Sequence, residues 1–419
     1  MIRDILLMQK RELETRLEEK CTERDISLKG IDNNLIKVIT GPRRAGKSFF
    51  AIHTLKKIDN FGYVNFDDEK LVTVNNYDEI IIAINSLYNN PKFLLLDEIQ
   101  NLEKWELFVN RLQRQGYNLV ITGSNSKLLS KEMATHLTGR HISITIFPFS
   151  FKEFLKTEYN VLTESEIKEK LFTYLTYGGY PEPLIKNLDY KDYLSTLFNS
   201  IIYKDIVKRF NIRYVQAIED LGVYLITNTA KEFSYTTLAK VTKCKSVHTV
   251  EKYLGYLEET FIFFKIDRFS FKIREQLSSN KKIYCTDNGL IHAKAFKFSS
   301  DTGRLFENTV AIELKKLEMN EKIKLFYWKN SQQEEVDFVV KVGLKIKQLI
   351  QVCFDINNIK TKEREIRALL KASKELECKN MLIITEDYDA KECVEWFSIK
   401  GNVRFIPLWK WLQKPFKIK

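Results

Sequence analysis

The chain has 419 residues, of which 44% are hydrophobic and 29% are charged, the balance of a folded, soluble protein rather than a disordered one. A single hydrophobic core rarely serves more than about 300 residues, so we expect two or three domains. The 67 Lys and Arg residues against 55 Asp and Glu residues give a net charge of +12. This surplus favours polyanionic partners such as nucleic acid, nucleotides or an anionic membrane face, although it does not require one.

The cysteines and the N-terminus exclude several classes of protein. No C-x-x-C pair and no zinc-like cluster with histidine is present, which predicts reduced thiols in a cytoplasmic protein; the cysteines are Cys21, Cys244, Cys285, Cys353, Cys378 and Cys393. The first 20 residues are charged from Arg3 onward and lack the apolar core of a signal peptide. No apolar run approaches the roughly 20 residues that cross a bilayer. Secreted and membrane-spanning classes are therefore set aside.

The first third of the chain has the pattern of a layered α/β domain. Residues 1–30 are predicted to form a charged amphipathic helix. Between residues 31 and 150, apolar segments alternate with helical stretches; the apolar segments are 35–40, 63–66, 93–97, 117–123 and 141–147. Continuous apolar strands separated by helices are typical of a parallel sheet that is covered on both faces.

The remaining chain is predicted to form three further parts. Residues 151–212 have helical periodicity and form a helical lid, interrupted by a Gly- and Pro-rich loop at 177–184. Residues 213–295 contain short helices followed by two strand-like segments, which is the element order of a winged helix. Residues 296–419 combine helices and strands into a second, separate α/β unit.

A phosphate-binding loop follows the first predicted strand. Residues 41–48 read Gly-Pro-Arg-Arg-Ala-Gly-Lys-Ser, a full match to G-x-x-x-x-G-K-[ST] between a strand and a helix. The glycines let backbone N–H groups face a phosphate at the start of a helix. Lys47 is expected to contact the β- and γ-phosphates of ATP, and Ser48 to ligate Mg²⁺. The predicted nucleotide-binding residues are Gly41, Pro42, Arg43, Arg44, Ala45, Gly46, Lys47, Ser48 and Phe49.

Polar residues end the third and fourth predicted strands. Asp97 and Glu98 follow the apolar segment FLLL; Asp97 is expected to assist the metal and Glu98 to orient or deprotonate the attacking water. Without the upstream phosphate loop, such an acidic pair would indicate only a solvated strand end. Asn125 follows the next strand and is expected to hold the water and sense the γ-phosphate. The alternative for Asn125 is a helix N-cap.

Several motifs together resemble the AAA+ ATPases common in archaea and bacteria: GPRRAGKS, LLLDEIQ, ITGSNS, LTGR followed by FPFSFKEF, and YGGYPEP. In that family a winged helix and a C-terminal, restriction-endonuclease-like DUF4143 domain follow the ATPase. The resemblance spans nearly the whole chain and implies an α/β fold with an AAA+ P-loop sheet, a helical and winged-helix middle, and a nuclease-like α/β domain. It also implies that Arg140 is an arginine finger acting on a neighbouring subunit, and hence a homo-oligomer. The alternative for Arg140 is a surface arginine at a helix end.

The C-terminal third resembles a restriction-endonuclease-like core in which the active site is degenerate. Active members hold Mg²⁺ with an Asp and a Glu-x-Lys on adjacent strands. Asp337 matches the Asp, and Glu307 matches an assisting acid on a helix. Gln351 stands in place of the Glu and Cys353 in place of the Lys; an amide is a poor Mg²⁺ ligand and a thiol supplies no ammonium. We therefore predict a binding or docking module without cleavage.

The segment 236–260 has the helix, turn and helix rhythm of a DNA-binding unit. Its basic and polar residues are expected to contact duplex DNA; they are Lys240, Lys243, Lys245, Ser246, His248 and Thr249. The alternative is a protein-docking module with solvated lysines. The alternating Phe263, Phe264, Phe269 and Phe271 are predicted to pack in the core and wing rather than to stack on bases.

The sequence thus predicts a Mg²⁺-dependent AAA+ ATPase that converts ATP and water to ADP and phosphate. Turnover is expected to drive remodelling of DNA or of a protein partner. Two alternatives stay open, an ATP-gated DNA- or protein-binding switch with little turnover and an ATP-dependent DNA nuclease. Glu98 argues against the switch, and Gln351 and Cys353 argue against the nuclease.

Overall fold

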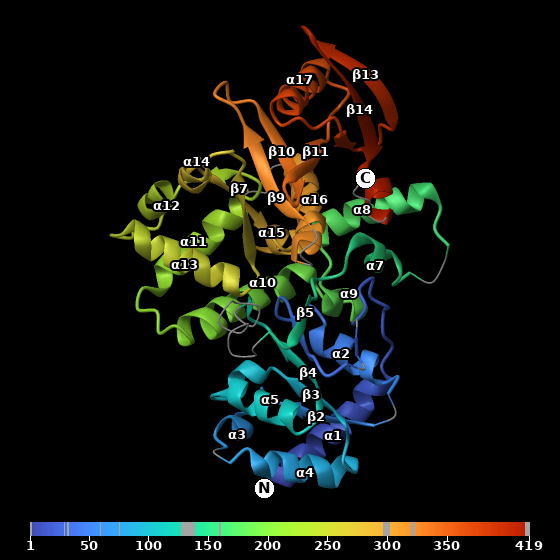
Figure 1. Cartoon of the computed structure of the whole chain (residues 1–419), viewed down its shortest axis with the longest axis vertical. Coiled ribbons are helices and arrows are strands. Elements are labelled where there is room, and N and C mark those ends of the chain that lie inside the picture. Colours follow the sequence, from blue (N-terminus) through green and yellow to red (C-terminus); the bar gives the residue numbers. More distant parts are fainter. Residues whose placement is uncertain are drawn as a thin grey trace. The chain divides into compact units, whose positions relative to one another are not determined.

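The structure is a computed structural model that describes residues 2–28, 30–31, 33–58, 60–74, 76–126, 139–158, 161–295, 302–319 and 323–414. The chain divides into two compact units, each with its own sheet (Figure 1). Unit 1 comprises residues 1–148 with 259–261, and unit 2 comprises residues 149–258 with 262–419.

Within its described residues, unit 1 contains a parallel sheet of five strands in the order β2-β3-β4-β1-β5. The strands are β1 (Ile36–Thr40), β2 (Phe61–Asn65), β3 (Phe93–Asp97), β4 (Asn118–Gly123) and β5 (His141–Thr145). Consecutive residues Leu94, Leu95 and Leu96 are all fully buried. Because neighbouring side chains of a strand point to opposite faces, both faces of this sheet are covered, and the predicted α/β layer is confirmed.

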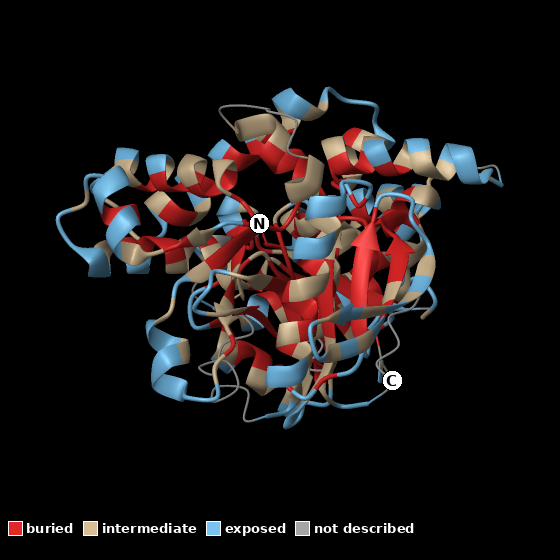
Figure 2. Ribbon diagram, turned by 90° about the horizontal axis from the view of Figure 1, so that it is seen from above, coloured by how far each residue is buried: buried red, intermediate tan, exposed pale blue. Residues whose placement is uncertain are grey.

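Helices follow the strands of unit 1 in chain order. They are α2 (Lys47–Leu55), α3 (Glu69–Val72), α4 (Asp78–Tyr88), η1 (Ile99–Asn101) and α5 (Trp105–Arg114). In α5 the buried residues Trp105, Phe108, Val109 and Leu112 recur at helical spacing, so that one face of the helix packs on the sheet. Figure 2 shows the same division in other elements, with strands and inward helix faces buried and outer helix faces exposed.

The N-terminal helix α1 (Ile2–Glu18) packs along β2 and α4 through buried residues that include Leu6 and Leu13. It ends earlier than the predicted limit of residue 30, and residues 20–28 continue without regular secondary structure. Strand β2 is an edge strand. The Gln9 side chain donates to the Asn65 carbonyl at 3.0 Å and accepts from the Asn65 N–H at 2.9 Å. Helix α1 therefore pairs backbone groups that the edge would leave exposed.

Unit 2 begins with a helical region, as predicted. Its helices are α7 (Phe151–Leu155), α8 (Glu164–Tyr177), α9 (Pro181–Ile185), α10 (Tyr190–Ser200), the π-helix η3 (Ile201–Lys208) and α11 (Val215–Thr227). The Gly-rich loop between α8 and α9 approaches Asp287, which accepts a hydrogen bond from the Gly179 N–H at 2.7 Å. A Cβ atom at Gly178, where φ is 75°, would lie 2.0 Å from an Asp287 oxygen. This loop therefore requires glycine.

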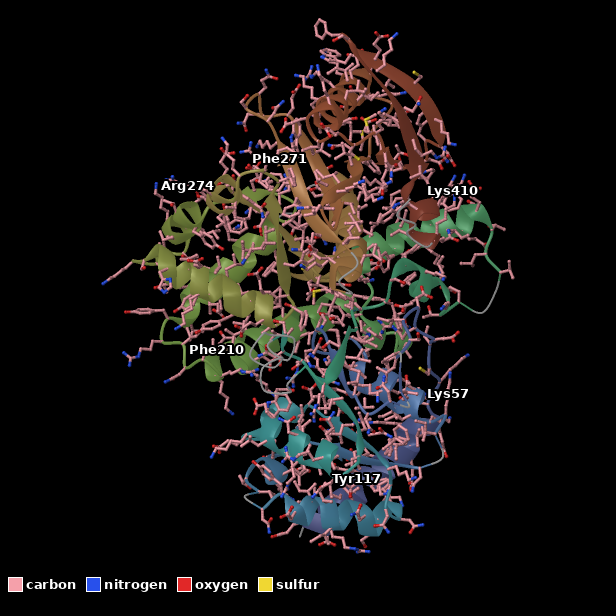
Figure 3. All side chains as sticks on the ribbon, in the orientation of Figure 1. Lys57, Tyr117, Phe210, Phe271, Arg274 and Lys410 are labelled. Atoms are coloured by element: carbon pink, nitrogen blue, oxygen red, sulfur yellow. The ribbon has the colours of Figure 1, made fainter. Side chains whose placement is uncertain are left out.

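The next segment alternates short helices and strands: β6 (Glu232–Phe233), α12 (Tyr235–Val241), α13 (Val247–Glu259), β7 (Phe263–Arg268), α14 (Ile273–Ser278) and β8 (Lys281–Cys285). Strand β8 pairs antiparallel with both β6 and β7. Phe263, Phe264 and Phe269 are buried as predicted, but Phe271 is 74% exposed, so the packing predicted for it is wrong (Figure 3). It precedes α14, which buries none of its residues. The winged-helix assignment stays a prediction.

The C-terminal elements continue the same sheet rather than forming a separate one. They are α15 (Asn288–Lys294), α16 (Thr302–Met319), β9 (Lys324–Lys329), β10 (Glu335–Val342), β11 (Lys345–Cys353), α17 (Ile359–Glu375), β12 (Met381–Thr385), β13 (Ala390–Trp396), β14 (Ile399–Pro407) and α18 (Leu408–Gln413). Strand β7 pairs with β9 through Asp267 and Phe326. The described strands of unit 2 thereby form one mixed sheet, β13-β14-β12-β11-β10-β9-β7-β8-β6.

Two features of this sheet differ from the sequence-based expectation. The sequence does not predict strand β13, because its side chains alternate between half-buried and exposed. Such a strand has no continuous run of apolar residues. The separation of residues 296–419 from the preceding segment was inferred from a change of pattern, which cannot reveal pairing between strands. The predicted domain boundaries themselves stay predictions. None of the helices in the described ranges is long and apolar enough to cross a membrane.

Candidate nucleotide-binding site

The phosphate loop connects the buried strand β1 to helix α2 and depends on glycine at both ends. Gly41 has φ of 142°, and a Cβ atom there would lie 2.0 Å from the Ile146 carbonyl oxygen. Gly46 has φ of 91° and is the N-cap residue of α2. Side chains at these two positions would be strained, whereas glycine adopts both conformations. The loop can therefore turn tightly from strand into helix.

Lys47 and the first turn of α2 supply this loop with a positive charge and with hydrogen-bond donors. The Lys47 ammonium is buried and donates to the Pro42 carbonyl at 2.9 Å. It also lies 3.9 Å from a carboxylate oxygen of Glu98. The N–H groups in the first turn of a helix have no acceptor within the helix, so they are donors for an anion. These groups fit the phosphates of a nucleotide.

Asp97 ends strand β3 and is the most strongly enclosed acid of the site, with an exposed fraction of 2%. Ser48 donates to its Oδ1 at 2.8 Å, Thr122 donates to the same oxygen, and Tyr63 donates to Oδ2 at 3.2 Å. Burial and the neighbouring Glu98 raise the pKa of Asp97, while the Thr122 and Ser48 hydrogen bonds lower it. An oxygen-rich pair of Ser48 and Asp97 fits the preference of Mg²⁺ for hard ligands.

Glu98 follows in an unusual backbone conformation, with φ of 51°. Its N–H donates to the Thr122 hydroxyl at 3.0 Å, and the Gln100 amide donates to its carboxylate at 2.5 Å. A left-handed conformation of a non-glycine residue costs on the order of 1 kcal/mol. These hydrogen bonds hold Glu98 beside Lys47 despite that cost.

The sheet order brings a third polar residue to this edge. Strand β4 lies between β3 and β1, and all three are parallel. Asn125, two residues beyond β4, is buried and follows the same carboxyl ends as Asp97 and the phosphate loop. The helix that Asn125 would cap in the alternative interpretation lies outside the described residues.

Arg140 is not brought to the phosphate loop of its own chain. It is exposed, immediately precedes β5, and accepts a hydrogen bond at its carbonyl from the Ile36 N–H at 2.9 Å. It therefore lies at the amino ends of β1 and β5, one strand length from their carboxyl ends. Five strand residues span about 16 Å. Leu137 and Thr138 of the same motif lie outside the described residues.

Three contributors to the site were missed by sequence reasoning. Tyr63 and Thr122 lie inside apolar strands, where a hydroxyl gives no separate signal. Arg24 follows helix α1 and donates to the Ala45 carbonyl of the phosphate loop at 3.1 Å and to the Phe147 carbonyl. These contacts join segments that are distant in sequence, so no local sequence pattern reveals them.

The predicted degenerate nuclease residues gather around a lysine that the sequence had not suggested. Lys282 of β8 has a side chain that is 3% exposed. Its ammonium lies 2.9 Å from Glu307 on α16, 3.1 Å from Asp337 on β10 and 2.5 Å from Glu335. Burial lowers the pKa of Lys282, but the surrounding carboxylates raise it above the usual value. The ammonium is therefore the charge partner of this cluster.

Gln351 and Cys353 complete this region without supplying a metal ligand set. The Gln351 side chain accepts from the Asp337 N–H at 3.2 Å and donates to Glu365 at 2.6 Å. Burial and Glu365 raise the pKa of Cys353 to about 12, so its thiol stays neutral. Within the residues that the structure describes, no group of three His, Cys, Asp or Glu side chains is placed to hold a metal ion.

The residues predicted to contact DNA gather at the turn between α12 and α13. All are exposed except Thr249, which is half-buried; they are Lys240, Lys243, Lys245, Ser246, His248 and Thr249. Ser246 accepts a hydrogen bond from the His248 N–H at 3.2 Å and so begins helix α13. Their side chains are accessible to a partner.

A parallel sheet with a phosphate loop after β1 and a buried acid at the end of β3 defines a P-loop nucleotide-binding protein. Family models match three consecutive segments, an AAA domain at residues 33–155, a domain of unknown function (DUF8612) at 168–301 and another (DUF4143) at 302–410. The AAA-domain and DUF4143 parts of the expected resemblance are confirmed, whereas the winged-helix and endonuclease-like details stay predictions.

Similar proteins span nearly the same length. The chain is 37% identical to the uncharacterized protein MJ1544 of Methanocaldococcus jannaschii, over 95% of this chain and 92% of that protein. It is 31% identical to an uncharacterized protein of Haemophilus influenzae, over 78% of this chain and 84% of that protein. Among solved structures, the Walker-type ATPase PABY2304 of Pyrococcus abyssi is 14% identical with a TM-score of 0.43, over 68% and 95% of the two chains. The chain belongs to the same family as MJ1544, and its own matches make it an AAA-type P-loop ATPase with a C-terminal DUF4143 domain.

Proposed function

We propose that the chain hydrolyses ATP to ADP and phosphate with Mg²⁺ at the carboxyl edge of the unit 1 sheet. One observation carries this proposal: the Ser48 hydroxyl donates to Asp97 at 2.8 Å while Glu98 lies 3.9 Å from the Lys47 ammonium. These are the group types that phosphoryl transfer requires, and they lie together at this edge of the sheet.

Each side chain has a distinct role in the proposal. Lys47 and the first N–H groups of α2 bind phosphate oxygens, and Ser48 and Asp97 hold the metal. When bound, Mg²⁺ supplies positive charge that neutralises the β- and γ-oxygens. Glu98 orients a water and accepts its proton, because its carboxylate lies 3.9 Å from the Lys47 ammonium that binds phosphate. Asn125, at the same edge of the sheet, donates a hydrogen bond to the attacking water and senses the γ-phosphate.

Arg140 acts on a neighbouring copy of the chain in this proposal. Its exposure and its place at the edge of the sheet opposite the phosphate loop support action on a nucleotide of another copy. A cation that approaches the γ-phosphate from outside neutralises charge that develops during transfer. Homo-oligomers in the presence of ATP are the expected consequence, and sedimentation at monomer mass with ATP bound would contradict it.

Turnover is proposed to remodel duplex DNA or a protein partner. The exposed lysines at the start of α13 and the net charge of +12 support a polyanionic partner. A nuclease activity is not proposed, because Lys282 is the ion partner of Glu307, Glu335 and Asp337. An ATP-gated switch remains the alternative that slow turnover would favour.

The test is steady-state ATP hydrolysis by the wild type and Glu98→Gln, each with and without duplex DNA at low salt. We expect turnover that requires Mg²⁺ and falls at least ~100-fold in Glu98→Gln. Glu103→Gln is the matched control, since the Glu103 side chain is 82% exposed and pairs only distantly with Lys104 at 4.0 Å. Stimulation by DNA indicates a nucleic-acid motor, and equal rates indicate a protein partner. ATP binding without turnover favours the switch.

A further inference from the structure

A chain of hydrogen bonds joins the N-terminal helix to the buried acid of the nucleotide site. Arg16 of α1 donates to the Tyr63 hydroxyl at 3.2 Å, and Tyr63 lies 3.2 Å from Asp97 Oδ2. Tyr63 is on strand β2, next to β3, with residue 63 in register with Leu95. All three residues belong to unit 1. The N-terminal helix thus reaches the metal-assisting acid through one buried tyrosine.

The direction of these hydrogen bonds follows from their donors. A guanidinium can only donate, so the Tyr63 oxygen accepts from Arg16 and its single proton is directed to Asp97. The same logic holds for Thr122, which accepts from the Glu98 N–H and donates to Asp97 Oδ1. Tyr63 therefore supplies the donor on one carboxylate oxygen, while hydroxyls on the phosphate-loop side supply those on the other.

A second contact ties the same N-terminal segment to the phosphate loop. The Arg24 guanidinium donates to the Ala45 carbonyl at 3.1 Å and also to the Phe147 carbonyl beyond β5. The segment from Arg16 to Arg24 therefore contacts both halves of the nucleotide site. The two contacts come from different side chains, Arg16 reaching strand β2 and Arg24 reaching the phosphate loop and the segment after β5, so they are independent of each other.

We infer that Tyr63, oriented by Arg16 of the N-terminal helix, is a positioning residue that holds the Asp97 carboxylate for Mg²⁺. This inference rests on the proposed function. Asp97 is 2% exposed, so water cannot replace a lost donor, and a buried carboxylate oxygen left without a partner destabilises the charged form. Without Tyr63 the carboxylate would be held only at Oδ1, by Ser48 and Thr122, and Oδ2 would lose its donor. Tyr63 therefore sets the affinity of the site for Mg²⁺ and not only its affinity for the nucleotide.

The test measures equilibrium binding of the fluorescent nucleotide mant-ATP to the full chain, once with Mg²⁺ and once with EDTA. The ratio of the two dissociation constants is the gain in affinity that Mg²⁺ provides. We expect Tyr63→Phe to shrink this gain about 10-fold and Arg16→Met about 3-fold, while binding in EDTA stays unchanged. Phenylalanine keeps the buried ring, so the change removes one hydroxyl.

Tyr88→Phe is the matched control. Tyr88 is also a buried tyrosine beside α1, with Lys10 5.2 Å from its ring, and its hydroxyl hydrogen-bonds with no side chain in the described part of the chain. We expect its Mg²⁺ gain to equal that of the wild type. A Tyr63→Phe chain that keeps the full gain, or that loses affinity equally in Mg²⁺ and EDTA, overturns the inference.

The proposed function fails separately from this inference. A wild type that binds no mant-ATP, or binds it equally with and without Mg²⁺, overturns the proposed function and the inference with it. The other outcome is that Mg²⁺ raises the affinity of the wild type and of Tyr63→Phe equally. That outcome overturns only the role of Tyr63. If Tyr63→Phe does not fold by circular dichroism, Arg16→Met decides, because Arg16 is only half-buried.

Discussion

Two buried aspartates of this chain lie on sheet strands, but their surroundings differ in kind. Asp97 in unit 1 is contacted by the hydroxyls of Ser48, Thr122 and Tyr63. Asp337 in unit 2 faces the ammonium of Lys282 at 3.1 Å. Hydroxyls orient a carboxylate and leave its charge available for a metal, whereas an ammonium neutralises that charge itself. The neighbours of an acid, more than its position on a strand, therefore decide whether its charge is available to a metal.

Removing the Lys282 ammonium tests whether it is the counter-ion of Asp337, and we expect the largest effect from this change. Lys282→Met removes the ammonium that Glu307, Glu335 and Asp337 share, although Glu335 keeps Lys329 at 3.9 Å. We expect it to lower the free energy of unfolding by about 3–5 kcal/mol. Urea denaturation followed by circular dichroism measures the change. Lys272→Met is the control, because its side chain is 78% exposed and such surface changes stay within about 0.5 kcal/mol. Equal stability of Lys282→Met and the wild type would show that Lys282 is not the counter-ion.

Neutralising each aspartate in turn compares the two sites directly. Asp97→Asn removes a charge that the metal needs, so we expect Mg²⁺-dependent ATP turnover to fall about 10–100-fold. Asp337→Asn removes a charge paired with Lys282, and we expect turnover to stay within about twofold of the wild type. Steady-state phosphate release measures both. Equal losses in the two variants would mean that the sites are not separate in function.

The acid beside Lys282 predicts a pH dependence of stability. Burial and the neighbouring Asp337 raise the pKa of Glu307 from 4.5 to about 7. The folded state therefore keeps a proton that the unfolded state has released, and the stability from Glu307 is complete below pH 4.5 and is lost as pH rises through about 7. We expect the free energy of unfolding to fall across this window by on the order of 1 kcal/mol per pH unit. Glu307→Gln should lessen that slope without abolishing it, because burial also raises the pKa of Asp287 to about 7; a slope equal to that of the wild type contradicts the assignment.

Restoring the missing nuclease motif should have the smallest effect. In Gln351→Glu with Cys353→Lys, the Glu-x-Lys pattern returns on β11, but Lys282 still contacts Glu307 and Asp337. We expect no cleavage of supercoiled plasmid with Mg²⁺ or Mn²⁺, as in the wild type. Cleavage by the double variant, abolished by Asp337→Ala, would show that the two substitutions alone had silenced the site.

Much of unit 1 could be predicted because its signals are local. Continuous apolar segments such as residues 93–97 identify buried parallel strands, and each of the five predicted strands is present. The phosphate loop carries its own backbone requirement at Gly41 and Gly46. The end of α1 at Glu18 could not be predicted in the same way, because its charged, weakly periodic sequence is also compatible with a longer helix.

Two of the misses, Lys282 and β13, share one physical cause, which is that they depend on the pairing of strands. From the sequence, Lys282 is expected to be a surface lysine like Lys281. Its burial becomes apparent only in the structure, where β8 belongs to the same sheet as β10. Strand β13 likewise can be identified only in the structure, where it pairs with β14 at the edge of the sheet. Long-range pairing brings together residues far apart in the chain, and no short pattern contains that information.

The sequence by itself determined the phosphate loop, the acidic pair Asp97 and Glu98 and the class of the first domain, since each depends on neighbouring residues and on backbone preferences. The tertiary structure alone decided that Tyr63 and Arg16 support Asp97, that Arg140 lies at the opposite edge of the sheet, and that an ammonium accompanies Asp337. Burial is the reason: a polar group removed from water must find its partner within the fold, and the fold chooses that partner.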